Sequence, residues 1–457
     1  MPKLTIHRGT KQIGGSCVEL QSASGERLII DLGMPLNDEK PDKKWLPKVD
    51  GLLTGDPNIK GILVSHAHAD HYGLLHFAHP SIPVFMSGYQ KRVLNEVALY
   101  FVPHTKPCPH ATTVEADAEF AVGKSFKVMP ILMDHSAFGG FSFLVTIDGE
   151  KRVLYSGDFR GHGRANLLGR FCMNPPKSVD ALLMEGTTLN RKTGDATGSG
   201  LAMRFKTERE ITDEFRAAFD KAGKGLCTVM CSGQNISRLA GIASAAKAAG
   251  KTFVVDFYTA QVILATKNEK FIGQFRKYMG VFLPKNQKNI ITREGEKLFK
   301  KLRTVDSQRV FLPSEWRFFT VLLPSKAEKR RMKDKYVFED VSTQSKFVFL
   351  LNGSVLADLK SERGLIFEQP IFSMWTGYWE KREKMKWQKK FVSDQGFSEP
   401  LFIHTSGHAS PSDLRRYVMA ASPKWLVPIH TEAPGDYAQL YPIEKIRALE
   451  DNEWMDL

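Results

Sequence analysis

Three histidines and an aspartate lie within six residues, directly after a short apolar run. The run, residues 61–64, predicts a buried strand whose end presents His66 and His68, while Asp70 and His71 start a helix. Imidazole and carboxylate groups are typical ligands of zinc or manganese. A solvent-exposed turn rich in histidine is the alternative, but it does not explain four such side chains at this spacing. The cluster therefore predicts a site for one divalent metal ion or two.

Four further strands are predicted to deliver a histidine or a carboxylate at their carboxyl ends. These side chains are, in chain order, Asp31, His135, Asp158 and Glu185. Ligand-binding clefts of α/β proteins form at such a sheet edge, so we expect one cleft to gather these groups. Asp31 is suited to accept the free N–H of a ligating imidazole. An aspartate that only caps its turn is the alternative for this residue.

The C-terminal part of the sequence holds a second histidine cluster. His408 and His430 each follow a predicted strand. Ser406, Gly407 and Ser410 supply hydroxyls and backbone N–H groups shortly before a predicted helix, an arrangement that suits a phosphate group. An ordinary Ser/Gly turn is the alternative. Two other histidines, at positions 104 and 110, lie in a proline-rich stretch and are interpreted as surface loop residues.

The histidines are distributed unevenly. All 13 lie at residues 7–162 or 404–430, so the candidate metal site belongs to the two ends of the chain. The middle alternates predicted helices and strands, which is typical of a doubly wound α/β unit. We therefore expect a first metal-site part at 1–205, an insertion at 206–358 and a second metal-site part at 359–457.

The charge is concentrated in the same middle region. The net charge of the chain is +14, and residues 265–335 hold 19 Lys+Arg against 7 Asp+Glu, which leaves +12. A second basic run covers Lys381–Lys390. Solvated helix faces explain part of such an excess, but an imbalance of this size favours a nucleic-acid surface.

The composition is that of a water-soluble globular protein, with 42% hydrophobic and 25% charged residues. No apolar run approaches the ~20 residues of a membrane helix, and the start of the sequence lacks the apolar region of a signal peptide. Five scattered cysteines argue against a disulfide framework and for the cytoplasm. Cys227 and Cys231 lie in a strand-like run and are interpreted as core thiols, not as a metal site.

These residues resemble the motifs of a known family. The segment His66–His71 resembles the HxHxDH signature of the metallo-β-lactamase superfamily, and residues 155–163 are similar to a motif of its nucleic-acid branch, the β-CASP nucleases. Glu185, His408 and His430 resemble the three further motifs of that branch. Residues 373–378 are similar to a stretch of ribonuclease J. The resemblance implies an α/β fold, a metallo-β-lactamase αββα sandwich with an inserted β-CASP α/β domain.

The resemblance also implies roles for the motif residues. One divalent ion would be held by His66, His68 and His135. The second would be held by Asp70, His71 and His430. Asp158 would bridge the ions and Asp31 would orient their ligands. The catalytic residues would be Asp70, Glu185 and His408, the last two beside the scissile phosphate. Zinc is the expected metal, with manganese as the alternative.

The implied function is that of a metal-dependent ribonuclease. A hydroxide activated by two metal ions would hydrolyse phosphodiester bonds of single-stranded RNA, as a 5′→3′ exonuclease, an endonuclease or both. The basic insertion would hold the strand, and a histidine at position 430 favours RNA over DNA. A DNA nuclease of the same fold, a small-molecule metallo-hydrolase and a metal-free RNA-binding scaffold are the alternatives. A homodimer is left open, and no membrane partner is expected.

Overall fold

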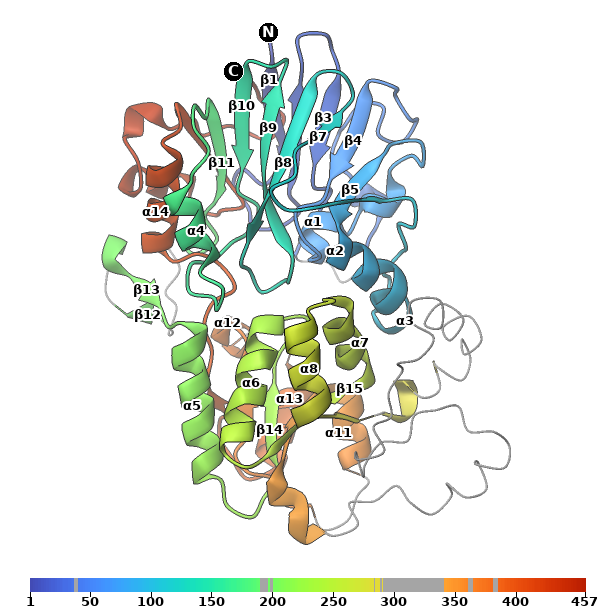
Figure 1. Cartoon of the computed structure of the whole chain (residues 1–457), viewed down its shortest axis with the longest axis vertical. Helices are drawn as coiled ribbons and strands as arrows, with labels where there is room; N and C mark the ends of the chain where they lie inside the picture. Colours follow the sequence, from blue (N-terminus) through green and yellow to red (C-terminus); the bar gives the residue numbers. More distant parts are fainter. Residues whose placement is uncertain are drawn as a thin grey trace. The chain divides into compact units, whose positions relative to one another are not determined.

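The computed structural model describes residues 1–36, 40–189, 196–197, 200–282, 284–287, 290, 341–360, 365–380 and 385–457. Most of the basic segment 265–335 and the first part of the basic run Lys381–Lys390 lie outside the described residues. The chain forms two compact units, which Figure 1 shows in the colours of the sequence. Unit 1 comprises Met1–Asn95, Val102–Phe205 and Ser406–Leu457, and unit 2 comprises Glu96–Phe101 and Lys206–Thr405.

The first sheet of unit 1 has the strand order β21-β1-β2-β3-β4-β5-β6. Its strands are β1 (Lys3–Arg8), β2 (Cys17–Gln21), β3 (Arg27–Ile30), β4 (Ile59–Leu63), β5 (Val84–Ser87), β6 (Thr112–Val114) and β21 (Trp454–Asp456). β1 pairs antiparallel with β2 and β21, whereas β3 to β6 run parallel. The β1–β21 pair brings the two ends of the chain together, as Figure 1 shows.

The second sheet of unit 1 has the strand order β20-β11-β10-β9-β8-β7. Its strands are β7 (Phe120–Val122), β8 (Phe126–Met133), β9 (Gly140–Ile147), β10 (Lys151–Tyr155), β11 (Ala181–Glu185) and β20 (Trp425–Ile429). β7 to β10 form an antiparallel meander, and β10, β11 and β20 are parallel. β20 therefore adds a strand from the C-terminal part of the chain to a sheet built by the N-terminal part.

The layers of unit 1 follow from the alternation of side chains along its strands. Ile30 of β3 and Phe143 of β9 belong to the core shared by both sheets. Their neighbours Ile29 and Leu144 point the other way and belong to the two outer cores. This period of two is what a strand buried on both faces requires. Each such side chain is fully buried and contributes about 1.5–3 kcal/mol of transfer free energy.

Helices cover both outer faces of the two sheets. Leu74 and Leu94, beside α1 (Ala69–Tyr72) and α2 (Gly88–Arg92), pack on the first sheet. Leu168 of α4 (Leu167–Met173) and Leu414 of α14 (Pro411–Ala421) pack on the second sheet. The four layers are therefore helix, sheet, sheet and helix, which confirms the αββα sandwich.

Unit 2 is built on a sheet with the order β16-β15-β17-β14-β18-β19. Its strands are β14 (Cys227–Met230), β15 (Thr252–Asp256), β16 (Met279–Phe282), β17 (Phe347–Leu350), β18 (Ile371–Phe372) and β19 (Leu401–Phe402). Every pairing among them is parallel. The described helices are α3 (Leu99–Phe101), α5 (Glu208–Lys221), α6 (Ile236–Ala248), α7 (Phe257–Ala265), α8 (Glu269–Tyr278), α11 (Gly353–Leu359), α12 (Thr376–Glu380) and α13 (Lys386–Asp394). This is the doubly wound α/β arrangement expected for the insertion.

The end of the insertion differs from the expected one at residue 358. Residues 359–405 belong to unit 2, because β18 pairs with β14 and β19 pairs with β18. The sequence-based boundary missed this, because β18 and β19 are only two residues each and give little strand pattern. The histidine-free stretch itself extends to residue 403. Among the described residues, no helix is long and apolar enough to cross a bilayer.

A buried ion cluster in unit 1 makes the stability of the fold depend on pH. Glu19 of β2 is 1% exposed and accepts hydrogen bonds from Arg27 Nε and His7 Nε2 at 2.5 and 2.7 Å. Burial opposes ionisation, but His7 and Arg27 outweigh it and lower the pKa of Glu19. The cluster therefore stabilises the fold above the ordinary glutamate pKa of about 4.3, and this contribution is lost as the pH falls through the lower folded-state pKa.

We expect Glu19→Gln to lower the free energy of unfolding by about 3 kcal/mol at pH 7 and by less at pH 3, measured by urea titration. An equal loss at both pH values would contradict this.

Candidate metal centre

The predicted metal ligands converge at one edge of unit 1, where strands of both sheets end. His66 and His68 follow β4, and Asp70 and His71 lie on α1 directly after them. His135, Asp158 and His430 follow β8, β10 and β20. Parallel strands of a sheet end at the same edge, so the residues that directly follow them lie close together. The seven side chains form two groups, and within each group the donor atoms lie within 4.8 Å of one another.

The first group consists of three histidines. His68 Nδ1 lies 3.1 Å from His66 Nε2 and 3.0 Å from His135 Nε2. The edge of a tetrahedron around a zinc ion with Zn–N bonds of 2.0–2.1 Å is about 3.3 Å. Both distances from His68 are therefore close to those between the ligands of one tetrahedral ion.

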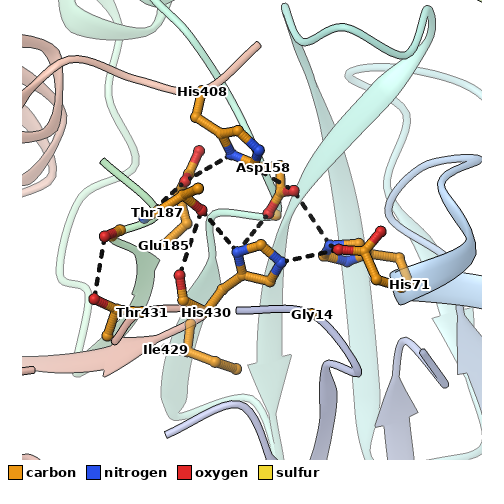
Figure 2. Close-up of polar contacts among 12 residues, drawn as sticks. Gly14, His71, Asp158, Glu185, Thr187, His408, Ile429, His430 and Thr431 are labelled. Carbon is orange, nitrogen blue, oxygen red and sulfur yellow. Dashed lines mark hydrogen bonds and ion pairs between the residues drawn. The ribbon is translucent and has the colours of Figure 1, made fainter. Parts of the chain in front are cut away.

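The second group consists of Asp70, His71, Asp158 and His430. Asp70 Oδ2 lies 3.2 Å from His430 Nε2 and 3.8 Å from His71 Nε2. Asp158 Oδ2 is 3.3 Å from His71 Nε2, and it is also 3.7 Å from His66 Nε2 in the first group. Asp158 thus lies between the two groups, in a position from which one carboxylate can serve both. Figure 2 shows Asp158 between His71, His408 and His430.

Hydrogen bonds on the outer side of the imidazoles decide which nitrogen faces the centre. Asp31 is fully buried, and its Oδ2 accepts from His71 Nδ1 at 2.7 Å. Tyr155 and Ser65 also donate their hydroxyls to this oxygen, at 2.8 and 2.7 Å. A carboxylate can only accept, so His71 Nδ1 carries the proton and Nε2 presents its lone pair. Asp31 therefore holds the imidazole of His71 and does more than cap a turn.

The same logic fixes the tautomer of two other histidines but not that of His430. Ser65 uses its hydrogen on Asp31, so its oxygen accepts from His66 Nδ1 at 3.1 Å. The carbonyl of Gly407 accepts from His135 Nδ1 at 2.6 Å. His430 Nδ1 lies 2.8 Å from the hydroxyl of Thr187, as Figure 2 shows. For His66 and His135, Nε2 is therefore left with a lone pair directed at the centre, whereas the Thr187 hydroxyl can donate to or accept from His430 Nδ1 and does not fix its tautomer.

Two buried polar atoms at the centre have no hydrogen-bond partner within the described part of the chain. These are His71 Nε2 and Asp158 Oδ1. Leaving such atoms unsatisfied costs about 1–3 kcal/mol each, and more for a charged group. A cation between the imidazoles and carboxylates would satisfy both atoms. The donor set therefore fits a divalent metal ion, and unit 1 contains a divalent metal-binding centre.

The charges at the centre favour the ligating states of Asp70 and His68, whereas they favour the protonated state of His71. Burial acts to raise the pKa of Asp70, but the nearby His71 and His430 outweigh burial, and the pKa of Asp70 is lowered to about 2. Burial lowers the pKa of His68 to about 4. Burial also acts to lower the pKa of His71, but three carboxylates led by Asp158 raise it well above its ordinary value. Asp70 is therefore ionised and His68 neutral, which are the states that bind a metal.

Glu185 and His408 lie beside the metal ligands and form a third group with Asp158 and His430. His408 Nδ1 is 3.0 Å from Glu185 Oε2 and 3.7 Å from Asp158 Oδ2. The Glu185 side chain is 1% exposed, and its other oxygen accepts from the backbone N–H of Phe159 at 2.9 Å. The His408 side chain is 23% exposed. Of the pair, His408 is therefore the group that a substrate can reach.

The loop before α14 holds the residues expected to contact phosphate. Ser406 Oγ accepts from the backbone N–H of His408 at 3.0 Å. Ser410 is 1% exposed, and its Oγ is the N-cap of α14, accepting from Asp413 N at 3.2 Å. The hydroxyl of Ser410 is therefore used inside the fold, whereas Ser406 and Gly407 are half-buried.

Sequence reasoning missed Ser65, Tyr155 and Thr187, which hold the ligands from outside. Their only signal was adjacency to the motif residues, because hydroxyls contact backbone and side chains throughout proteins. His104 and His110 belong to none of the metal-binding groups found in the described ranges. Cys227 is a buried free thiol of β14, as predicted, whereas the free thiol Cys231 lies just after that strand and is half-buried.

The family comparison agrees with this geometry. Residues 39–200 match the model of the beta-lactamase superfamily domain. In this part of the chain, the fold, the donor set and the match are those of the beta-lactamase superfamily domain. Over a longer stretch the chain is similar to ribonuclease J and to an RNase J-like protein.

The similarity to ribonuclease J comes from curated relatives. The chain is 27% identical over 248 residues to the RNase J-like protein of Methanocaldococcus jannaschii, covering 51% of this chain and 52% of the relative. It is 24% identical over 405 residues to ribonuclease J of Sinorhizobium meliloti, covering 85% of this chain and 60% of the relative. The matches thus span about half the length of these relatives. A crystal structure of a protein of unknown function from Enterococcus faecalis has the same fold, with a TM-score of 0.68, 17% identity and full coverage of both chains.

Proposed function

We propose that this chain is a metal-dependent ribonuclease that hydrolyses phosphodiester bonds of single-stranded RNA. The observation that carries the proposal is the pair of donor groups with Asp158 between them and His408 beside them. Two relatives that carry the name ribonuclease J support RNA as the substrate. The five free cysteines fit a reducing compartment such as the cytoplasm.

Two ions, zinc with manganese as the alternative, would occupy the centre. The first would be held by His66, His68 and His135. The second would be held by Asp70, His71 and His430, with Asp158 between them. A pair of divalent ions supplies Lewis acidity, which activates water for attack on phosphorus and offsets the charge of the phosphate oxygens.

The chain's own residues orient the substrate and move a proton. Glu185 accepts the Nδ1 proton of His408, which leaves Nε2 of His408 directed away from the carboxylate. From this position, Nε2 protonates the leaving oxygen or contacts the phosphate. Ser406 and Gly407 seat a phosphate at or beside the 5′ end, which favours 5′→3′ exonucleolysis. The basic residues of the insertion hold the strand through its phosphates.

Digestion of matched RNA and DNA oligonucleotides labelled at the 5′ end tests this function. We expect the wild type to cut RNA with zinc or manganese, and the variant Asp70→Ala with His71→Ala to be inactive, because both residues are donors of the second group. A labelled mononucleotide released first indicates exonuclease action, and internal fragments indicate an endonuclease. A 5′-hydroxyl RNA that is cut as fast as 5′-phosphate RNA would contradict the 5′-phosphate seat.

The same experiment separates the alternatives. Cleavage of DNA at the rate of RNA would favour a DNA nuclease of the same fold. Cleavage of neither polymer, with metal bound, would favour a small-molecule hydrolase. A protein that binds RNA but neither zinc nor manganese would favour a scaffold.

A further inference from the structure

The segment Arg160–Gly163 begins two residues after Asp158, and the proposed reaction does not use it. Its two large side chains are nevertheless deeply buried: Arg160 is 0% and His162 5% exposed. A buried guanidinium is costly unless it is paired and hydrogen-bonded, so its presence requires a structural or functional reason. Both side chains reach the loop that carries His408.

The target of both side chains is one backbone carbonyl. His162 Nε2 donates to the carbonyl of Ser406 at 2.7 Å, and Arg160 Nη1 donates to the same oxygen at 3.4 Å. A carbonyl can only accept, so Nε2 of His162 carries the hydrogen. Ser406 is two residues before His408, and its own Oγ accepts the His408 backbone N–H.

Two carboxylates hold Arg160 and His162 from the other side. Asp134, the neighbour of the metal ligand His135, pairs with Arg160 Nε at 3.2 Å. Asp413, in the first turn of α14, lies 3.7 Å from His162 Nδ1. Burial acts to raise the pKa of Asp413, but His162 outweighs it and the pKa is lowered. The segment is thus fixed between the His135 strand end and the α14 helix.

The two glycines of the segment show how closely it wraps these carboxylates. A Cβ on Gly163 would lie 1.5 Å from Asp134 Oδ2, and one on Gly161 would lie 2.2 Å from Asp413 Oδ1. The backbone N–H of Gly161 donates to Asp413 Oδ2 at 3.2 Å. Any side chain at either position would displace the carboxylate that holds Arg160 or His162.

Further carbonyls of the same loop are anchored as well. The Gly407 carbonyl accepts from the metal ligand His135 at 2.6 Å, and the Ala409 carbonyl accepts from Thr188 Oγ1 at 2.5 Å. The backbone on both sides of His408 is therefore held by hydrogen bonds from other segments of unit 1, although the His408 side chain reaches solvent. The anchor nearest the start of the loop is the one made by Arg160 and His162.

We propose that Arg160 and His162 are positioning residues that hold the loop Ser406–Ser410 so that His408 meets Glu185 and the scissile phosphate. This inference rests on the proposed function, because it assigns His408 a contact with the substrate. It explains why the motif after Asp158 continues as Arg-Gly-His-Gly: the charged groups hold the loop, and the glycines admit the carboxylates that hold them.

Kinetics of four variants test the proposal. We expect His162→Ala to lower kcat about 10- to 100-fold with KM and metal content unchanged, because His408 is displaced while the metal ligands stay. His162→Gln keeps an N–H near the position of Nε2 and should recover most of the rate. Adding His162→Ala to His408→Ala should cause no further loss, because both changes remove one function. His7→Ala removes another buried histidine and serves as the control for stability loss without a fall in kcat.

Hydrogen exchange of the loop tests the inference without RNA. We expect faster amide exchange of residues 406–410 in His162→Ala than in wild type, and unchanged exchange in β8 and β9. If exchange is faster in His162→Ala but the wild type cuts no RNA, the loop anchor is supported and only the ribonuclease proposal is contradicted. Unchanged exchange, or an additive loss in the double variant, would overturn the positioning role.

Discussion

Asp158→Asn is expected to remove metal binding and activity together while leaving the fold in place. The substitution keeps the shape of the side chain but removes a charge that lies close to both donor groups, with Oδ2 3.3 Å from His71 Nε2 and 3.7 Å from His66 Nε2. We expect the metal content per chain to fall and kcat/KM for RNA to fall by about 10³-fold, because the electrostatic stabilisation of the phosphate is lost.

Metal analysis of the purified variant and its cleavage rate at saturating zinc or manganese provide the measurement. Glu150→Gln removes one carboxylate from an exposed turn and is the matched control, expected to match wild type. Full metal content with a normal rate in Asp158→Asn would refute the shared position of this carboxylate. Loss of metal from only one site would show that Asp158 serves a single ion.

The second large effect is expected for Gly33→Ala, which changes no ligand. A Cβ at this position would lie 1.7 Å from the carbonyl oxygen of Asp70. The same region is held by hydrogen bonds from Leu32 N to His71 O at 2.8 Å and from Met34 N to Ala69 O at 3.0 Å. The contact is with backbone, so α1 has to move, and Asp70 and His71 move with it.

We expect Gly33→Ala to lower the free energy of unfolding by about 3 kcal/mol and the cleavage rate by about 10²-fold. The measurements are thermal unfolding, metal content and RNA cleavage. Gly435→Ala is the control, because a Cβ there meets no atom within 4 Å. Wild-type metal content in Gly33→Ala would mean that α1 tolerates the shift and that the position of Asp70 is less constrained than the close approach indicates.

Most of the donor set could be predicted from the sequence because each donor is placed locally. An apolar strand is recognised by its pattern, and the residue after it lies at the end of that strand whatever the rest of the chain does. His66 and His135 are examples. The separation of the histidine-bearing ends from the histidine-free middle likewise indicated an insertion.

Long-range pairing decided what local patterns could not. Glu185 and His430 are neighbours because β11 and β20 pair in parallel, with Glu185 opposite Ile429. The sequence contains no signal that joins two strands more than 240 residues apart; only the resemblance to a known family suggested that the two belong together. The same reason explains residues 359–405, which joined unit 2 through short strands.

The sequence by itself determined the chemistry of this protein: which donors are present, and that they stand at the ends of strands. Only the tertiary structure decided their states and partners. It placed Asp31 on His71, made Ser410 a helix cap, and turned Arg160 and His162 toward the Ser406 carbonyl. The physical reason is that a hydrogen bond needs both partners within about 3 Å, and that distance is set by the packing of strands and loops far apart in the chain.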